Sequence, residues 1–286
     1  MVWVADRKAR LPDVMATLSE FFEPFTAVIV TGGSSGIGKS FIKLVGNVKP
    51  ELVVCNLSRC HPDIKSVALK LHHIAIDLSE PARIEFAAEE ALRWLGREAP
   101  VGKVLFINNS GFGGYGIFPE PDLAHQLGMI NVNIRAGVEL TGRLLPMLKA
   151  RGGAIVNVAS TAAFQPTAYM AVYGATKAFV LHWSLALNEE LRGTGVRALA
   201  VCPGPTATEF FRRAGLEAGS VADQLSMSSE AVALAALRAL ANGRSVVVTG
   251  WTNKIGAFLV TKLPKPLATS LTARVLARFR LKRVVR

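Results

Sequence analysis

The amino-acid sequence predicts an α/β fold, in which a doubly wound, mostly parallel sheet of seven strands forms a single domain. Short runs rich in β-branched residues alternate along the chain with longer helical stretches. The short runs are continuously apolar, which is typical of strands buried on both faces of a parallel sheet. No Pro/Ser-rich linker and no internal repeat divides the 286 residues, and 50% of them are hydrophobic, enough for a large core.

The apolar runs place the expected strands at residues 25–31, 51–58, 72–78, 103–109, 153–160, 196–202 and 245–250. Helical stretches are expected between them at about 36–46, 80–95, 122–149, 170–192 and 229–242. This pattern divides the chain into an N-terminal extension of residues 1–24, a main domain of residues 25–250 and a C-terminal tail of residues 251–286. The run "VMATLSEFFEPF" predicts a short helix in the extension.

The formal net charge of +12 is concentrated at one end of the chain. Residues 1–230 hold 22 Lys and Arg against 21 Asp and Glu, whereas residues 231–286 hold 11 basic residues and no acid. The body is therefore close to neutral, which argues against a basic face that binds duplex nucleic acid.

The cysteines, the N-terminus and the lengths of the apolar runs indicate where the protein is located and which kinds of chemistry are excluded. The cysteines Cys55, Cys60 and Cys202 form no C-x-x-C pair, and no metal-binding constellation is present, so we expect reduced thiols and no metal. The N-terminus has no apolar signal region, and no apolar run reaches the roughly 18 residues of a spanning helix. We therefore expect a cytoplasmic protein. The composition of its tail is also compatible with peripheral contact with a membrane surface. A G-x-S-x-G serine-hydrolase elbow is also missing.

A glycine-rich turn follows the first expected strand, in "AVIVTGGSSGIGKS" at residues 27–40. It stands between a strand and a helix, the context that a phosphate-binding turn requires. Glycines allow close approach of the backbone, and the helix N-terminus offers free N–H groups and the positive end of its dipole. Thr31, Ser34 and Ser35 add hydroxyl donors. The position of Lys39-Ser40 relative to Gly38 excludes a P-loop.

The spacing Thr-Gly-x-x-x-Gly-x-Gly resembles the short-chain dehydrogenase/reductase family. Further segments resemble the family's motifs in order, over roughly residues 25–250: "INNSG" (107–111), "NVNIRAGVEL" (131–140), "IVNVAS" (155–160), "YGATK" (173–177) and "CPGPTATEF" (202–210). "INNSG" departs from the family's Asn-Asn-Ala-Gly by having Ser110. The resemblance implies a Rossmann-type NAD(P)-binding catalytic domain and an oxidoreductase that interconverts a carbonyl and a secondary alcohol.

The residues themselves support this chemistry, since carbonyl reduction needs an acid that protonates the developing alkoxide. Tyr173 is the one tyrosine of three with a lysine four residues on, and this spacing places Tyr173 and Lys177 on the same helix face. We expect the ammonium group of Lys177 to lower the pKa of the Tyr173 phenol. Ser160, at the end of a strand, can polarise the carbonyl oxygen. The resemblance assigns the fourth active-site position to Asn133, with Asn131 as a neighbouring competitor.

Cofactor choice in such folds depends on the end of the second strand. The segment "CNLSRC" offers Ser58 and Arg59 and no acid there, and a guanidinium pairs with a 2′-phosphate, so NADP(H) is favoured over NAD(H). The resemblance extends the predicted cofactor site beyond the glycine turn. The predicted cofactor residues are Thr31, Gly32, Ser34, Ser35, Gly36, Ile37, Gly38, Arg59, Asp77, Leu78, Asn109, Tyr173, Lys177, Pro203, Gly204, Thr206 and Thr208.

The substrate is specified less closely than the cofactor. "TAAFQPTAYM" (161–170), "GFGGYGIF" (111–118) and a lid expected at residues 208–228 suit a small-molecule, lipophilic carbonyl or alcohol, with an acyl-thioester as one version. The alternatives are a catalytically silent nucleotide-binding regulator and a membrane-peripheral reductase of a lipid or an acyl-thioester. A homo-oligomer without nucleic acid is expected. In the tail, Leu267, Leu271, Val275 and Phe279 form a stripe with a basic flank, which fits either a membrane-surface helix or packing on the domain or a sister subunit.

Overall fold

The computed structural model describes residues 11–64, 69–210, 214 and 226–278. Its main sheet has seven strands in the order β3-β2-β1-β4-β5-β6-β9, and every pairing in it is parallel. The predicted fold class is confirmed, with the refinement that the sheet is entirely parallel. The strands are β1 (Phe25–Thr31), β2 (Val53–Ser58), β3 (Lys70–Ala75), β4 (Lys103–Asn108), β5 (Gly153–Val158), β6 (Val196–Cys202) and β9 (Val246–Val248).

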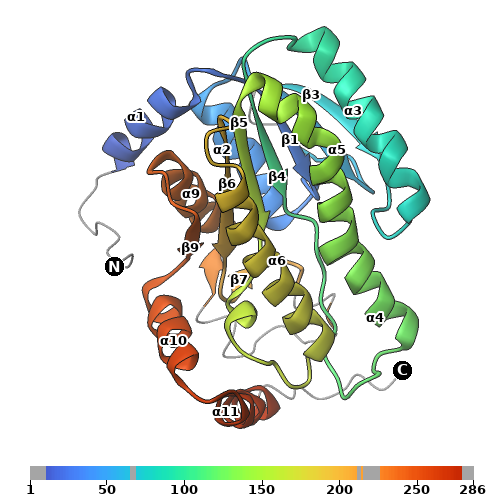
Figure 1. Cartoon of the computed structure of the whole chain (residues 1–286), viewed down its shortest axis with the longest axis vertical. Helices are drawn as coiled ribbons and strands as arrows, with labels where there is room; N and C mark the ends of the chain where they lie inside the picture. The colour runs from blue at the N-terminus through green and yellow to red at the C-terminus, as the bar shows by residue number, and fades with distance from the viewer. Residues whose placement is uncertain (1–10, 65–68, 211–213, 215–225, 279–286) are drawn as a thin grey trace.

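Helices cover both faces of this sheet (Figure 1). One apolar core joins the sheet to α3 (Ile84–Glu98), α5 (Ala136–Arg151) and the end of α6 (Ala171–Glu190). A second core on the opposite face joins it to α1 (Leu11–Phe22), α2 (Gly36–Val48) and α9 (Ser229–Ala241). The central strands are therefore buried on both sides, which explains their unbroken apolar sequences.

The N-terminal helix α1 contributes to the second core. Val14, Leu18 and Phe22 recur at a spacing of four, and all three are buried beside apolar residues of α9. The helix predicted from the sequence is therefore present and begins by Leu11. The division of the chain at residues 24 and 250 stays a prediction.

The connections along the chain position the functional site. The chain moves from β1 outward to β3, then crosses back to β4 on the other side of β1 and continues outward to β9. The crossovers therefore diverge between β1 and β4. In doubly wound sheets, ligands bind in the crevice at the carboxyl ends of the strands at this point.

The helix expected at 122–149 is interrupted. The structure has α4 (Leu123–Ile130), a π-helical segment (Asn131–Arg135) and then α5. Asn133 lies within the widened turn, and its side chain forms two hydrogen bonds with the backbone of Phe112, from Phe112 N and to Phe112 O, each 3.0 Å long. The periodicity of apolar residues continues through the segment, so it did not indicate this local change.

Smaller elements follow the main strands. The 3₁₀ segments η1 (Pro81–Arg83) and η3 (Thr161–Phe164) come after β3 and β5. A two-stranded ribbon, β7 (Thr206–Ala207) with β8 (Met227–Ser228), joins the two ends of the expected lid. Most residues of that lid lie outside the described part of the chain.

The described part of the C-terminal tail, residues 251–278, contains two helices, α10 (Trp251–Lys262) and α11 (Lys265–Arg278), at the lower end of the molecule in Figure 1. Helix α11 covers the first part of the helix expected at 265–286, and residues 279–286 lie outside the described residues. Among the helices described, none combines the length and the apolar character needed to cross a membrane.

Candidate active site

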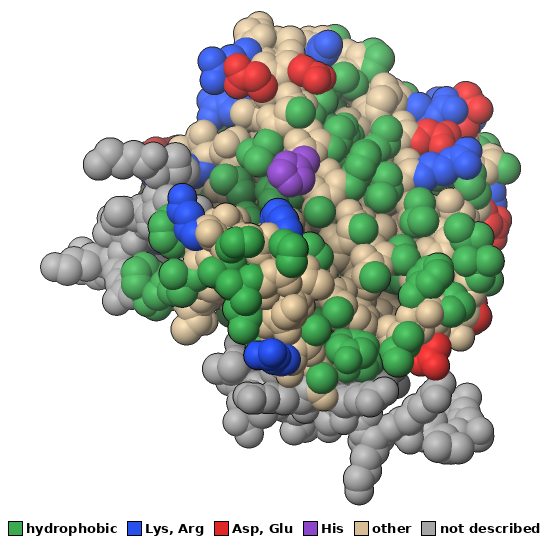
Figure 2. Space-filling view, turned by 60° about the horizontal axis from the view of Figure 1, so that its bottom comes forward, with side chains coloured by type: hydrophobic (Ala, Val, Ile, Leu, Met, Phe, Trp, Pro, Cys, Tyr) green, Lys and Arg blue, Asp and Glu red, His purple; other side chains and the backbone are tan. Residues whose placement is uncertain are grey.

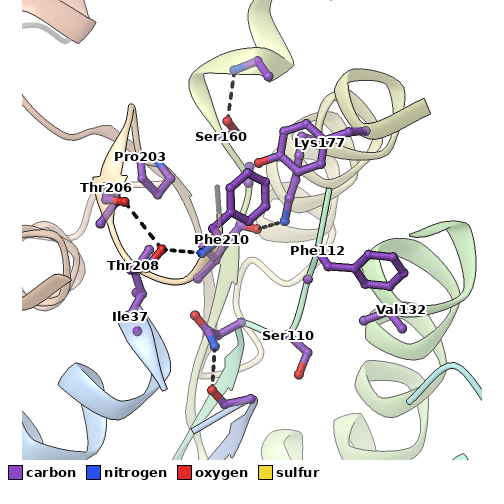
Figure 3. Close-up of a pocket in the computed structure, with 18 of the residues that line it drawn as sticks. Ile37, Ser110, Phe112, Val132, Ser160, Lys177, Pro203, Thr206, Thr208 and Phe210 are labelled. Carbon is purple, nitrogen blue, oxygen red and sulfur yellow. Dashed lines mark hydrogen bonds between the residues drawn. The ribbon is translucent and has the colours of Figure 1, made fainter. Parts of the chain in front are cut away.

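A cavity of about 870 Å³ lies at the carboxyl ends of the central strands. It is lined by the glycine turn before α2, by the segments that follow β2, β3, β4, β5 and β6, and by one side of α11. Figure 3 shows part of this lining, in which the side chains of Ser160, Lys177 and Phe210 converge. The cavity thus joins the predicted cofactor residues to the predicted catalytic residues.

The glycine turn closes only because its glycines have no side chains. A Cβ atom on Gly38 would lie 2.3 Å from the carbonyl oxygen of Gly32, and one on Gly33 would lie 2.4 Å from Oδ1 of Asn56. Gly36 has a φ of +52°, in the left-handed region that favours glycine. Ser35 precedes α2 without a side-chain capping hydrogen bond, so the first N–H groups of the helix stay available to an anionic ligand.

Thr31 joins β1 to the segment after β4. Its buried hydroxyl oxygen accepts hydrogen bonds from the backbone N–H groups of Asn109 and Ser110, each 2.9 Å long. Asn109 donates in return to the carbonyl oxygen of Thr31, at 2.9 Å. The expectation that this hydroxyl faces a phosphate differs from the structure: Thr31 holds the floor of the turn together, whereas Ser34 and Ser35 line the cavity.

Ser160, Tyr173 and Lys177 meet at the inner end of the cavity. Ser160 follows β5 and begins η3, where its Oγ accepts a hydrogen bond of 3.1 Å from the N–H of Ala162. Tyr173 and Lys177 lie one turn apart on α6, and both are buried. Lys177 Nζ donates to the carbonyl oxygen of Val158 at 2.8 Å and lies 5.9 Å from the centre of the Tyr173 ring.

Burial sets the protonation of this pair. It raises the pKa of Tyr173 to about 12, although a hydrogen bond with the Ser160 side chain acts in the opposite direction. Burial also lowers the pKa of Lys177 to about 8. The sequence-based expectation that Lys177 lowers the pKa of the phenol is therefore not met in the structure. The cause is that removal from water disfavours the charged form of each group.

Asn133 lies behind these residues and does not line the cavity. It is buried, and its Nδ2 donates to Thr176 Oγ1 at 3.0 Å, next to Lys177 in sequence. A Cβ atom on Gly111 would lie 3.1 Å from Asn133 Oδ1 and 3.0 Å from Lys177 Nζ, so both side chains approach the same glycine. Asn131, the competitor, instead donates to the carbonyl oxygen of Ser79. Asn133, unlike Asn131, is therefore hydrogen bonded beside Lys177, and its active-site role stays a prediction.

At the other end of the cavity, Arg59 follows β2 and its side chain is 67% exposed. Its Nη1 lies 3.8 Å from Oδ2 of Asp77, which follows β3. Burial alone would raise the pKa of Asp77, but the pKa is lowered because the N–H and hydroxyl of Ser79 donate to the carboxylate and because Arg59 and Arg83 lie nearby. Arg59 is thus placed to meet an anionic group in the cavity.

The segment after β6 closes the cavity from a third side. Pro203 accepts a hydrogen bond of 2.8 Å from the N–H of Thr161, which ties this segment to the residue after Ser160. Thr208 Oγ1 accepts a hydrogen bond of 3.3 Å from the N–H of Phe210 (Figure 3). This places the Phe210 ring 5.2 Å from the Tyr173 ring, measured between centroids.

An apolar cluster includes Tyr173. Met129 and Met170 pack with Tyr173, and the partly buried rings of Phe112, Tyr115 and Phe210 extend the cluster. Helix α11 adds four further lining residues, which are Leu271, Thr272, Val275 and Leu276. Individual roles for these α11 residues were not predicted from the sequence, although the spacing of Leu271 and Val275 in the tail was the signal that could have indicated them.

The structure brings together most of the predicted site residues. Those that line the cavity are Gly32, Ser34, Ser35, Gly36, Ile37, Arg59, Asp77, Leu78, Asn109, Ser160, Tyr173, Lys177, Pro203, Gly204, Thr206 and Thr208. Thr31, Gly38 and Asn133 lie behind the lining and shape it. Within the described residues, no cluster of three His, Cys, Asp or Glu side chains is arranged to hold a metal ion.

Comparison with known proteins gives a consistent result. The family model described as short chain dehydrogenase matches residues 26–218. A curated relative, "Ketoacyl reductase HetN" of Nostoc sp., is 29% identical over 257 residues, covering 87% of this chain and 83% of the relative.

Solved structures show the same fold. A short-chain dehydrogenase from Sphingobium yanoikuyae in complex with NADPH has a TM-score of 0.69 and 26% identity, and the match covers 92% of this chain and 98% of that one. A short-chain dehydrogenase/reductase from Burkholderia phymatum in complex with NAD has a TM-score of 0.69 and 20% identity, over 82% of this chain and 92% of that one.

Proposed function

Because the chain belongs to the short-chain dehydrogenase/reductase family and is an oxidoreductase of that family, we propose that it is an NADP(H)-dependent enzyme that interconverts a lipophilic carbonyl and its secondary alcohol. The observation that carries this proposal is the convergence of Ser160, Tyr173 and Lys177 at the inner end of a cavity whose outer end is the glycine turn. A nucleotide-binding regulator without turnover would not need this arrangement.

The residues at the outer end fit a dinucleotide. A Cβ atom would collide with the Asn56 side chain at Gly33 and with the Gly32 carbonyl oxygen at Gly38, so only glycine allows the turn to pack this closely. The uncapped N-terminus of α2 and the hydroxyls of Ser34 and Ser35 are donors suited to a pyrophosphate. Asp77 and Leu78 would border the adenine, and Pro203, Gly204, Thr206 and Thr208 the nicotinamide end.

NADP(H) is proposed over NAD(H) on the chemistry of the β2 end. An acid there would bind a ribose 2′-hydroxyl, whereas Ser58 and Arg59 offer a hydroxyl and a guanidinium. The Arg59 side chain is largely exposed and borders the cavity, so it can turn to a 2′-phosphate. Its weak contact with Asp77, at 3.8 Å, is easily exchanged.

When bound, the nicotinamide supplies or accepts the hydride. The remaining chemistry is proton transfer by this chain's residues. In the direction of reduction, Tyr173 donates its phenolic proton to the developing alkoxide, and Ser160 donates a hydrogen bond to the same oxygen. A phenol with a pKa of about 12 is fully protonated at neutral pH, which suits a proton donor.

Lys177 and Asn133 support this step. With a pKa of about 8, Lys177 carries its proton at neutral pH and can stabilise the phenolate that remains after proton transfer. Lys177 is also proposed to bind the nicotinamide ribose. Asn133 acts as a positioning residue, because its amide links Phe112 at the substrate side to Thr176 beside Lys177.

The substrate class follows from the inner lining. Phe112, Met170 and Phe210 surround Tyr173 with apolar surface, which favours a long-chain or ring ketone or an acyl-thioester over a small polar one. We also propose a homo-oligomer, since α4 to α6 expose several large apolar side chains. These are Leu123, Leu127, Ile130, Val138 and Phe179. A cytoplasmic location remains part of the proposal.

A panel assay tests this function. Oxidation of NADPH and NADH is followed with steroid-like ketones, long-chain ketones, 3-oxoacyl-thioesters and small polar carbonyls. We expect turnover with NADPH and the lipophilic members. Binding of NADPH without turnover of any member would favour the regulator, and turnover limited to small polar carbonyls would contradict the substrate class.

A further inference from the structure

The two C-terminal helices carry an extensive exposed apolar surface. Helix α10 buries only Ala257 and α11 only Ala268 among their described side chains, so most of each helix faces outward. The exposed apolar residues recur at helical spacings on one face of each helix. They are Trp251, Ile255, Phe258 and Leu259 of α10, and Leu267, Leu271 and Val275 of α11. We call these seven residues the α10–α11 surface.

This surface has basic and no acidic neighbours within its own helices. The sequence 251–278 contains Lys254, Lys262, Lys265, Arg274 and Arg278 and no Asp or Glu. Figure 2, which turns the lower end of the molecule toward the reader, shows hydrophobic side chains gathered beside Lys and Arg side chains. An exposed apolar face with a basic border is the composition of an interfacial helix on an anionic membrane.

We propose that the α10–α11 surface docks onto an anionic lipid bilayer, and that a lipophilic carbonyl enters the active-site cavity directly from that bilayer. The first part stands on the C-terminal helices alone, whereas the second rests on the proposed function. No described helix can span a membrane, so the contact is with the membrane surface.

The geometry of α11 connects the docking surface to the cavity. Leu271 and Val275 belong to both, since they line the cavity and yet are 41% and 52% exposed. Two hydrogen bonds hold the helix in this position: Tyr115 Oη donates to the carbonyl oxygen of Leu276 at 2.9 Å, and Thr272 Oγ1 donates to that of Pro166 at 3.0 Å. The apolar mouth of the cavity therefore lies along the helix that would touch the lipid.

A second copy of the chain fits this surface less well. In a symmetric dimer the same patch would meet itself, and each copy would bring Lys262, Lys265 and Arg274 with no carboxylate from either helix to pair with them. Like charges across an interface oppose association. Lipid phosphates supply the missing negative charge, and each basic side chain near such a surface strengthens binding about fivefold.

Co-sedimentation of the full chain with vesicles tests the proposal without measuring turnover. The probes are phosphatidylcholine vesicles with and without 30 mol% of phosphatidylglycerol (on the order of the anionic fraction at which surface charge matters). We expect the unaltered chain to bind the anionic vesicles. Binding should be at least tenfold weaker in each of the double variants Phe258→Ser/Leu259→Ser and Lys262→Glu/Arg274→Glu. The matched control, Phe86→Ser/Arg97→Glu, changes an exposed phenylalanine and an exposed arginine of α3 and should bind as the unaltered chain does.

Three results would overturn the docking proposal. They are equal binding to neutral and anionic vesicles, equal losses in the α3 control, and a change of oligomer size by light scattering in Phe258→Ser/Leu259→Ser without a loss of vesicle binding. The entry route is tested by turnover: vesicles should raise the rate with a bilayer-partitioned ketone and leave that with a water-soluble ketone unchanged. Vesicle binding with no turnover of any carbonyl would refute the proposed function and leave docking supported.

Discussion

The two ends of the cavity are built in different ways. The end proposed to bind the cofactor is formed by turns that directly follow β1, β2, β3 and β6, and its shape depends on close contacts such as those of Gly33 and Gly38. The end proposed to bind the substrate is formed by side chains from distant segments, including Phe112, Phe210 and Leu271. The cofactor end should therefore be sensitive to any added atom. The substrate end should tolerate exchange of one apolar side chain for another at a modest cost in stability.

The largest effect is expected where the two ends meet, at Lys177. We expect Lys177→Met to lower kcat by at least about two orders of magnitude, because the phenolate of Tyr173 loses its neighbouring positive charge.

The burial of Lys177 should also make the stability of the protein depend on pH. The pKa of Lys177 falls from 10.5 to about 8 on folding, so between these values the unfolded chain binds more protons and the unaltered protein gains stability as pH rises.

This gain amounts to about 3 kcal/mol, at about 1.4 kcal/mol for each pKa unit. Urea denaturation of both proteins at pH 7 and pH 10.5 measures it: the free energy of unfolding of the unaltered protein should rise relative to that of Lys177→Met. A constant difference across this range would show that the buried ammonium does not titrate as the geometry indicates.

A smaller effect is expected in the glycine turn. In Gly38→Ala the new Cβ would meet the Gly32 carbonyl oxygen at 2.3 Å, so the turn must open. We expect NADPH affinity, measured by fluorescence titration, to fall at least about tenfold, with a loss of about 1–3 kcal/mol in stability. Gly96→Ala in α3 is the matched control, since its Cβ would meet nothing within 4 Å. Equal NADPH affinity in both variants would mean that the turn does not hold the cofactor.

The preference for NADPH or NADH tests the role of the residues at the carboxyl end of β2. Ser58→Asp/Arg59→Ala places a carboxylate where the guanidinium was, so the ratio of kcat/KM for NADPH to that for NADH should fall by about tenfold or more, since a carboxylate repels the 2′-phosphate. The control is the single change Arg83→Ala, whose side chain lies near Asp77 but does not line the cavity. An unaltered protein that already prefers NADH would remove the basis of the assignment.

The smallest effect is expected at the substrate end. Leu271→Ala removes apolar lining from α11, and we expect KM for a lipophilic ketone to rise several-fold while the Kd for NADPH stays the same. Phe86→Ala on α3 controls for loss of an exposed apolar group. A change in NADPH affinity in Leu271→Ala would show that the two ends of the cavity are not separable.

The difference between local turns and contacts of distant segments also explains which features could be predicted from the sequence. The strands and the cofactor turns were predictable, because apolar runs and glycine spacing are local features of the chain. The interruption of the helix at 122–149 was not, because the hydrogen bonds of Asn133 to Phe112 join segments that are 21 residues apart. The contact of α11 with the cavity depends on Tyr115, 161 residues before Leu276.

The pKa values in the site were a second feature that could not be predicted from the sequence. The spacing of Tyr173 and Lys177 correctly placed them on one helix face, but it carried no information on burial. In the structure both groups are removed from water, and this burial raises the pKa of the phenol and lowers that of the ammonium group. Likewise, Thr31 was expected at the phosphate because of its hydroxyl, whereas the structure uses that hydroxyl to bind the backbone after β4.

The proton-donor role of Tyr173 is the central claim, and Tyr173→Phe tests it most directly because the ring stays and the hydroxyl is lost. Ketone-dependent NADPH oxidation and NADPH binding are measured side by side for the two proteins. We expect turnover to fall by about two orders of magnitude or more, with the Kd for NADPH unchanged. Turnover within about threefold of the unaltered enzyme would show that another group protonates the alkoxide.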